Sequence, residues 1–288
     1  MSPSVTVPSQ SGWNFSTMPL QLDEEELDDV SPLLPELVLE LDELDDERPR
    51  PASTVPSSAG SPALGTSSND TRNVQPAAPD AFSFDVADRE LAWGLARGFA
   101  VKGHTLLWGN APPFSTGTGI PVWLREAFPT VPLTPPEHDA LRALLRQYVE
   151  TTVRRYQGRL ATWDVTNETL NVFTQWFIDR LGPGIVEEMF AWVHAIDPGA
   201  ELVMNEWITE VFTGLPGPNA AAFRDRLLAL RAKGVPIHAV GQQSHFVPGA
   251  VYAGLPADLS VRTRIDDYAV ALDTLAEVGL PIHMTETN

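Results

Sequence analysis

The chain has 288 residues and a formal net charge of −19, which results from 38 acidic and 19 basic side chains. Its length suits one large α/β domain or two smaller ones. A negative surface disfavours nucleic acids and anionic membranes as partners, and it is compatible with a neutral substrate such as a polysaccharide. The absence of cysteine excludes disulfides and thiolate metal sites, and no apolar run approaches the roughly 20 residues that cross a bilayer.

The acidic residues are concentrated at the beginning of the chain. Residues 1–80 carry 15 acidic side chains and 3 arginines, or −12, and the remaining 208 residues carry 23 acidic and 16 basic side chains, or −7. Acidic runs at 23–29 and 42–47 flank a leucine-rich patch at 33–41, and Pro, Ser, Ala and Gly follow to about residue 80. Such a segment buries too little apolar surface to offset its ordering entropy. We therefore expect 1–80 to be mostly disordered, with the patch either solvated or docked on a partner as a short helix, and 81–288 to form the folded domain.

From Phe82 onward, helix-type and strand-type patterns alternate, which is typical of βα units and a parallel sheet. Apolar runs predict five strands, at 100–108, 160–165, 201–205, 237–242 and 281–286. Amphipathic patterns predict helices at 87–99, 135–156, 169–181, 184–196, 219–233 and 261–278. An eightfold (β/α)8 barrel needs roughly three strands more, two before Ala87 and one after Asn288. The alternative is an open, doubly wound sheet of five strands.

Polar side chains lie at the carboxyl end of every predicted strand, which favours a partial (β/α)8 barrel because a doubly wound sheet concentrates such residues at one switch point. In chain order they are His104 and Trp108, then Asn167 and Glu168, then Asn205, Glu206 and Trp207, then Gln243 and His245, and finally Glu286. The strand ends of a barrel face one cleft, so we predict a shared site. Two carboxyl groups on different strands are the groups that a retaining glycosidase requires.

Four motifs in this order resemble glycoside hydrolase family 10, the family of retaining endo-β-1,4-xylanases. They are Gly-His-Thr-Leu-x-Trp at 103–108, Trp-Asp-Val-x-Asn-Glu at 163–168, Gln-Ser-His at 243–245 and Thr-Glu at 285–286. The resemblance runs from about Phe82 to Asn288, or about 70% of the chain. It implies a (β/α)8 barrel that hydrolyses a polysaccharide with retention and needs no cofactor.

The resemblance makes Glu168 the general acid/base and Glu286 the nucleophile, and it implies that Asn167 bonds the sugar 2-hydroxyl. A retaining mechanism needs one ionised and one protonated carboxyl group, about 5–5.5 Å apart. The two glutamates must therefore have different environments. An anionic neighbour and partial burial would raise the pKa of the proton donor.

The resemblance also assigns supporting residues. It places His104 in the subsite of the cleaved sugar, with Trp108 as an apolar wall, and it places Gln243 and His245 beside the nucleophile. A histidine that donates a hydrogen bond to the nucleophile helps to keep it ionised. Trp108 and Trp207 offer flat faces for pyranose rings, although both are also compatible with a place in the core or at the rim.

The roles of Asn205 and Glu206 are less specific, and the sequence departs from the family's usual pattern at three places. Asn205 either contacts substrate or braces its strand end. Glu206 is expected either at the rim of the site or as support behind the residues that contact substrate, rather than as a third catalytic acid. Asn205-Glu206-Trp207 stands where the family usually has Asn-Asp-Tyr, and Gly109-Asn110-Ala111 stands where it has histidine, serine and glutamine. The family's first two strands have no clear match, and the chain ends two residues after Glu286. We therefore expect an incomplete barrel with open sheet edges.

Three functions are compatible with these residues. The first is a retaining endo-β-1,4-xylanase, the second is another β-glycanase such as a β-1,4-glucanase, and the third is an inactive relative that binds carbohydrate or a protein partner. No metal is expected, because the histidines are scattered and no His-x-x-x-His occurs on a helix. Localisation stays open, since the family is typically secreted and the first thirty residues show no basic region followed by an apolar one.

Overall fold

The structure is a computed structural model, and it describes residues 63–66, 74–75, 77–110, 119–211, 217–245 and 265–286. All of these residues belong to one unit of the chain, which begins at Ser61. The acidic runs and the leucine-rich patch lie outside the described residues, so the predictions made for them stay predictions. Within the described ranges, no helix is long and apolar enough to cross a membrane.

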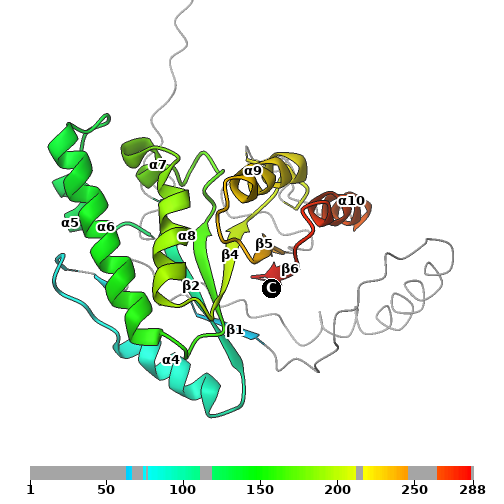
Figure 1. Cartoon of the computed structure of the whole chain (residues 1–288), viewed down its shortest axis with the longest axis horizontal. Helices are drawn as coiled ribbons and strands as arrows, with labels where there is room; N and C mark the ends of the chain where they lie inside the picture. Colours follow the sequence, from blue (N-terminus) through cyan, green and yellow to red (C-terminus); the bar gives the residue numbers. More distant parts are fainter. Residues whose placement is uncertain are drawn as a thin grey trace, which may run out of the picture. The chain divides into compact units, whose positions relative to one another are not determined.

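Six parallel strands form one sheet in the order β1-β2-β3-β4-β5-β6 (Figure 1). Their bounds are β1 Ala63–Thr66, β2 Ala100–Trp108, β3 Thr162–Asn167, β4 Glu201–Glu206, β5 Ala239–Gln243 and β6 Ile282–Thr285. Each strand pairs with the next strand along the chain, as in the wall of a βα barrel. A doubly wound sheet reverses its strand order at a switch point, so this alternative is wrong for the described sheet.

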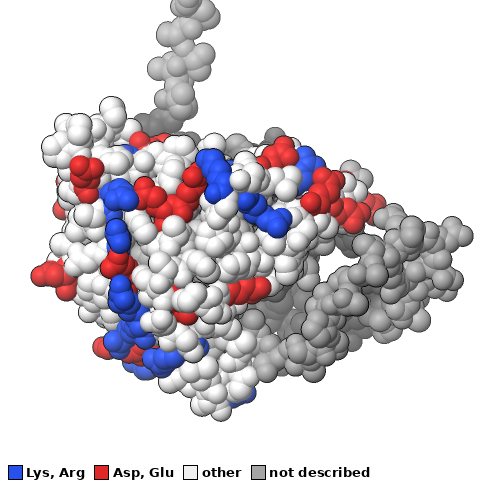
Figure 2. Space-filling view, in the orientation of Figure 1, with Lys and Arg blue, Asp and Glu red and all other residues white. Residues whose placement is uncertain are grey.

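The helices between the strands lie on one face of the sheet. They are α4 Asp85–Leu95, α5 Val122–Ala127, α6 Pro135–Tyr156, α7 Trp176–Leu181, α8 Ile185–Ile196, α9 Ala220–Ala232 and α10 Ile265–Ala276. Helix α4 packs against β2 and α8 packs against β3, and the pairs α6–α8 and α9–α10 lie side by side (Figure 1). On the outer helical face, basic and acidic side chains are interleaved (Figure 2). Arg142, for example, donates to Glu188 at 2.6 Å.

Helix α6 has the bounds that its sequence pattern predicts. Thr134 and Glu137 form a capping box at its beginning, with proline in the first turn. Its buried face includes Leu141, Leu145 and Tyr148, which contribute to the core between helices and sheet. Burial of this face stabilises the helix by roughly 1.5–3 kcal/mol for each large apolar side chain.

The structure differs from the sequence-based prediction at three elements. Strand β1 lies in the segment predicted to be disordered, before the expected boundary at residue 81, and it pairs with β2 from Ala63↔Ala100 to Thr66↔Gly103. A four-residue strand is too short to show a period, and its partner supplies its hydrogen bonds. The six-residue helix α5 was not predicted, and α7 begins at Trp176 rather than at 169. Residues 169–175 instead form turns, because Gln175 donates to the carbonyl oxygens of Thr169 and Asn171.

Candidate active site

The two glutamates of the predicted site directly follow β3 and β6. Both have a left-handed backbone conformation, with φ of 58° at Glu168 and 59° at Glu286. Such a conformation costs of the order of 1–3 kcal/mol and persists only where the surroundings enforce it. The Glu168 N–H donates to the carbonyl oxygen of Asn205 at 2.9 Å, and the Thr174 hydroxyl donates to the Glu168 carbonyl. The surrounding structure thus holds Glu168 at the carboxyl edge of the sheet.

Asn205 joins the two halves of the site. Its amide nitrogen donates to Glu286 Oε1 at 2.7 Å and to Asn167 Oδ1 at 2.9 Å. Thr285 donates to Asn205 Oδ1 at 2.6 Å, which fixes the orientation of the amide. Gly241 permits this arrangement, because a Cβ atom there would lie 2.5 Å from Asn205 Oδ1. Asn205 therefore braces the strand ends and contacts the predicted nucleophile.

Neutral amide groups surround the carboxyl group of Glu168. Gln243 Nε2 lies 3.1 Å from Glu168 Oε1 and 3.0 Å from Asn167 Oδ1. Asn167 Nδ2 lies 3.3 Å from the same Glu168 oxygen. A chain of hydrogen bonds therefore runs from Glu168 through Gln243, Asn167 and Asn205 to Glu286.

Two histidines face the carboxyl group of Glu286. His245 Nε2 lies 3.1 Å from Glu286 Oε2, and His104 Nε2 lies 3.9 Å from Glu286 Oε1. His104 Nδ1 lies 2.7 Å from Oδ2 of Asp164, which is fully buried and also contacts Lys102 Nζ at 2.6 Å. Burial alone would lower the pKa of His104, but the hydrogen bond and charge of Asp164 raise it above the ordinary value. The raised pKa favours the protonated, positively charged form of the His104 imidazole, which lies beside Glu286.

These surroundings shift the two glutamates in opposite directions. Burial and the charge of Glu286 raise the pKa of Glu168, against the lowering effect of the Gln243 hydrogen bond and the Trp108 indole. Burial would also raise the pKa of Glu286, but the hydrogen bond from His245 and the charge of His104 outweigh burial and lower it. The site therefore favours a protonated Glu168 and an ionised Glu286, which is the division of states that acid and nucleophile require.

The two tryptophans of the prediction have different positions. Trp108 ends β2 and is half-buried, and its indole lowers the pKa of Glu168, but its Nε1 atom is buried with no hydrogen-bond partner among the described residues. Trp207 is only 4% exposed and belongs to the core, where a Cβ atom at Gly217 would lie 2.3 Å from its ring. Its indole faces are covered by the protein, in agreement with the core alternative rather than with stacking on sugar.

Glu206 is completely buried, which agrees with the predicted support behind the substrate-contacting residues rather than with the alternative place at the rim. Its Oε2 accepts the Leu170 N–H at 2.8 Å and its Oε1 accepts the Trp207 N–H at 3.2 Å. Burial and the charge of Glu168 raise its pKa well above the ordinary value. Burial and the neighbouring negative charge thus favour the protonated form of Glu206, and the buried side chain has no free face toward a substrate.

Sequence reasoning did not assign three residues of this network, namely Lys102, Asp164 and Thr285. Asp164 stands within the Trp-Asp-Val-x-Asn-Glu motif, four residues before Glu168, and this position was the available signal. The register between β3 and β4 shifts between Asp164 and Thr166, so a strict two-residue period does not describe this part of the strand. Because the period alone does not decide which face Asp164 occupies, its contact with His104 was not predictable.

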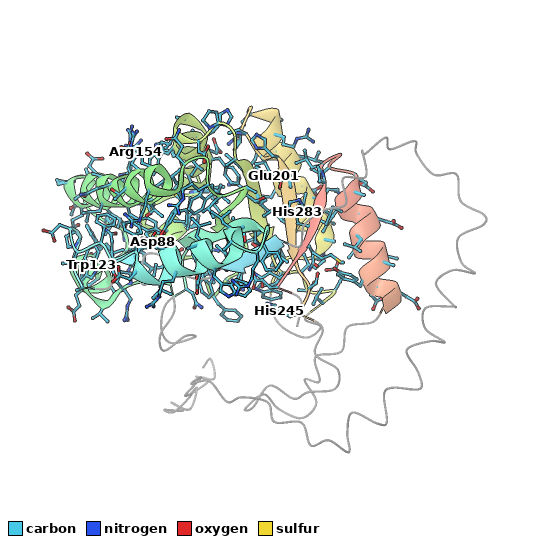
Figure 3. All side chains as sticks on the ribbon, turned by 90° about the horizontal axis from the view of Figure 1, so that it is seen from below. Asp88, Trp123, Arg154, Glu201, His245 and His283 are labelled. Carbon is cyan, nitrogen blue, oxygen red and sulfur yellow. The ribbon has the colours of Figure 1, made fainter. Side chains whose placement is uncertain are left out.

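His194, His238 and His283 lie outside the candidate site and contact other residues. His238 Nδ1 accepts the Leu202 N–H at 3.1 Å, and its ring packs edge-on against His194. His283 Nε2 of β6 lies 3.5 Å from Glu201 Oε2 at the beginning of β4. In Figure 3 the labelled Glu201 and His283 lie near each other and away from His245. In the part of the chain that the structure describes, no cluster of three or more His, Asp or Glu side chains could hold a metal ion.

Comparison with known proteins agrees with the family resemblance of the sequence motifs. The family model of glycosyl hydrolase family 10 matches residues 66–288. An endo-1,4-beta-xylanase A of a Caldicellulosiruptor species is 32% identical over 217 residues, which are 71% of this chain and 28% of that protein. The exoglucanase XynX of Acetivibrio thermocellus is 27% identical over 215 residues, or 71% of this chain and 17% of that protein.

A solved structure has a similar fold. The intracellular xylanase TsXylA of Thermoanaerobacterium saccharolyticum, in a complex of a mutant with xylotetraose, gives a TM-score of 0.59 at 25% identity. The match covers 77% of this chain and 64% of that chain. The chain therefore spans only part of the length of the proteins that it resembles.

Proposed function

Because the chain belongs to glycosyl hydrolase family 10, we propose that it is a retaining endo-β-1,4-glycanase that hydrolyses xylan through two glutamates. One observation supports this proposal most strongly, namely that Glu168 and Glu286 are joined by one hydrogen-bond network and shifted in opposite pKa directions. The substrate is then a neutral β-1,4-linked polysaccharide that lies across the carboxyl ends of the strands.

In the first step of the proposed reaction, Glu286 attacks the anomeric carbon while Glu168 protonates the departing glycosidic oxygen. Asn205 and His245 hold Glu286 ionised and fix its direction. The bond to the leaving sugar breaks, and a covalent glycosyl–Glu286 intermediate forms. General acid catalysis of this kind contributes about 10²–10⁴-fold to the rate.

In the second step, Glu168 acts as a general base. Glu168 is ionised after it has given its proton to the departing oxygen. Once Glu286 is esterified, its negative charge no longer raises the pKa of Glu168, so Glu168 stays ionised and is available to take a proton from the attacking water. Water attacks the anomeric carbon, the ester bond to Glu286 breaks, and the product keeps its configuration.

One observation favours a second candidate, a β-1,4-glucanase. The relative from Acetivibrio thermocellus is named an exoglucanase. Both candidates use the same two glutamates, so activity on cello-oligosaccharides but not on xylan would select the glucanase.

The test compares wild-type protein with Glu168→Ala, Glu286→Ala and the control Glu201→Gln on xylan and on aryl β-xylobiosides. Glu201 lies at the opposite end of β4 and should be dispensable. We expect Glu286→Ala to lose at least about 10⁴-fold in kcat, and Glu168→Ala to lose activity on xylan but to spare a dinitrophenyl leaving group in the first step. A folded wild-type protein that binds xylo-oligosaccharides without turnover would refute the proposal and support the inactive, sugar-binding alternative.

A further inference from the structure

Glu206 connects the end of β4 to the turn that carries Glu168. It is completely buried, and its Oε2 accepts the N–H of Leu170, two residues after Glu168, at 2.8 Å. The preceding residue, Asn205, accepts the Glu168 N–H through its carbonyl oxygen at 2.9 Å. Two consecutive residues of β4 therefore hold the turn on both sides of Glu168.

This turn needs such support because Glu168 has a φ of 58°. A residue with a side chain leaves the left-handed region when its tethers are removed. The Glu168 carboxyl group would then move away from Gln243, which bonds its Oε1 at 3.1 Å. The position of the acid/base thus depends on the Leu170 N–H staying bound.

The charged groups that face Glu206 are Glu168 from β3 and Glu286 from β6, and both are acidic. A buried anion beside two carboxyl groups would be strongly unfavourable, whereas a protonated carboxyl group still accepts hydrogen bonds. The Leu170 and Trp207 N–H groups need an acceptor in this buried position. A neutral acid satisfies all of these conditions.

We propose that Glu206 is a positioning residue for Glu168: it accepts the Leu170 N–H in a fully buried position and so holds the turn that carries the acid/base. Its effect on turnover rests on the proposed function, but its effect on the turn does not. Glu206→Gln keeps the length and one uncharged oxygen, which can accept the Leu170 N–H, while its NH2 group replaces the oxygen that accepts the Trp207 N–H. Glu206→Met keeps the length and removes the acceptor.

The experiment measures amide hydrogen exchange at Leu170 together with kcat/KM for aryl β-xylobiosides that carry poor and good leaving groups. For Glu206→Gln we expect exchange and kcat/KM within about threefold of wild type, and an unchanged alkaline limb of the pH profile, because one neutral group replaces another. For Glu206→Met we expect exchange at Leu170 at least about tenfold faster. Its kcat/KM should fall about 10–100-fold for a poor leaving group and less than about threefold for a dinitrophenyl group.

Asp197→Asn is the matched control, since Asp197 is also buried and accepts a backbone N–H, that of Gly158, at 3.1 Å. Asp197→Asn should leave amide exchange at Leu170 and kcat/KM unchanged. Unaltered exchange in Glu206→Met would overturn the proposal, and so would equal loss on both leaving groups. If Glu206→Met does not fold, Glu206→Gln decides, because a shifted alkaline limb or lost Leu170 protection contradicts a neutral tether. Absence of wild-type turnover would refute the proposed function, and exchange at Leu170 would still test the tether.

Discussion

Glu168 and Glu286 begin from the same side chain and nearly the same left-handed φ, yet they differ in the direction of their pKa shifts. Both are partly buried, and burial by itself would raise the pKa of each, so burial does not explain the difference. Glu168 receives its hydrogen bonds from neutral side chains such as Gln243, whereas Glu286 is faced by His104 and His245. Cationic donors outweigh the cost of burial and neutral donors do not. The two roles are therefore decided by neighbours rather than by the glutamates themselves.

The largest expected effect comes from Asp164→Asn, which removes the anion behind His104. Lys102 would stay buried without its partner at 2.6 Å, so we expect a loss of about 3–5 kcal/mol in the free energy of unfolding. Chemical denaturation measures it. Addition of Lys102→Met should recover part of the loss, and a purely additive double variant would contradict the pairing.

His245→Gln tests the cationic side of the comparison. The pKa of Glu286 is lowered partly by His245, and it should rise when the histidine is replaced. Because Glu286 must be ionised, the acid limb of kcat/KM should move to higher pH, and kcat/KM should fall about 10–100-fold. An unmoved acid limb would show that His104 and Asn205 suffice.

Gln243→Met tests the neutral side. The Gln243 hydrogen bond lowers the pKa of Glu168, so its loss should move the alkaline limb of kcat/KM to higher pH. We expect a fall of about tenfold in kcat/KM, because the Glu168 carboxyl group loses one fixed donor. The acid limb should not move, and a shift of both limbs would mean that Gln243 acts on Glu286 as well.

The smallest effect concerns stability and Glu206. Its pKa in the folded state is raised, so its contribution to stability is fully present below the unfolded pKa of about 4.3 and is lost as pH rises toward the folded pKa. Glu206→Gln should therefore match wild type in stability near pH 4 and have the higher Tm at pH 7.5. Thermal unfolding at both values measures this difference, and equal Tm values at pH 7.5 would argue against it.

Most of the fold was predictable from local patterns. Helix α6 has its predicted bounds of 135–156, and each of the five predicted strands is present within a few residues. Apolar periods and the capping box are local properties, so a single sequence reveals them. Strand β1 was missed because four residues show no period, and the first half of the expected 169–181 helix is a set of turns held by side chains such as Gln175.

The sequence by itself determined that the two glutamates and their strand-end neighbours Asn167, Asn205, Gln243 and His245 meet at one site, because strand order and strand ends can be read from local patterns and parallel strands bring their carboxyl ends to one edge. Tertiary structure alone decided what each residue does there. The burial of Glu206 and Trp207, the contact of Asp164 with His104, and the opposite pKa shifts of Glu168 and Glu286 all arise between residues far apart in the chain. Electrostatic effects depend on distance and burial, and neither is a property of a residue's position in the sequence.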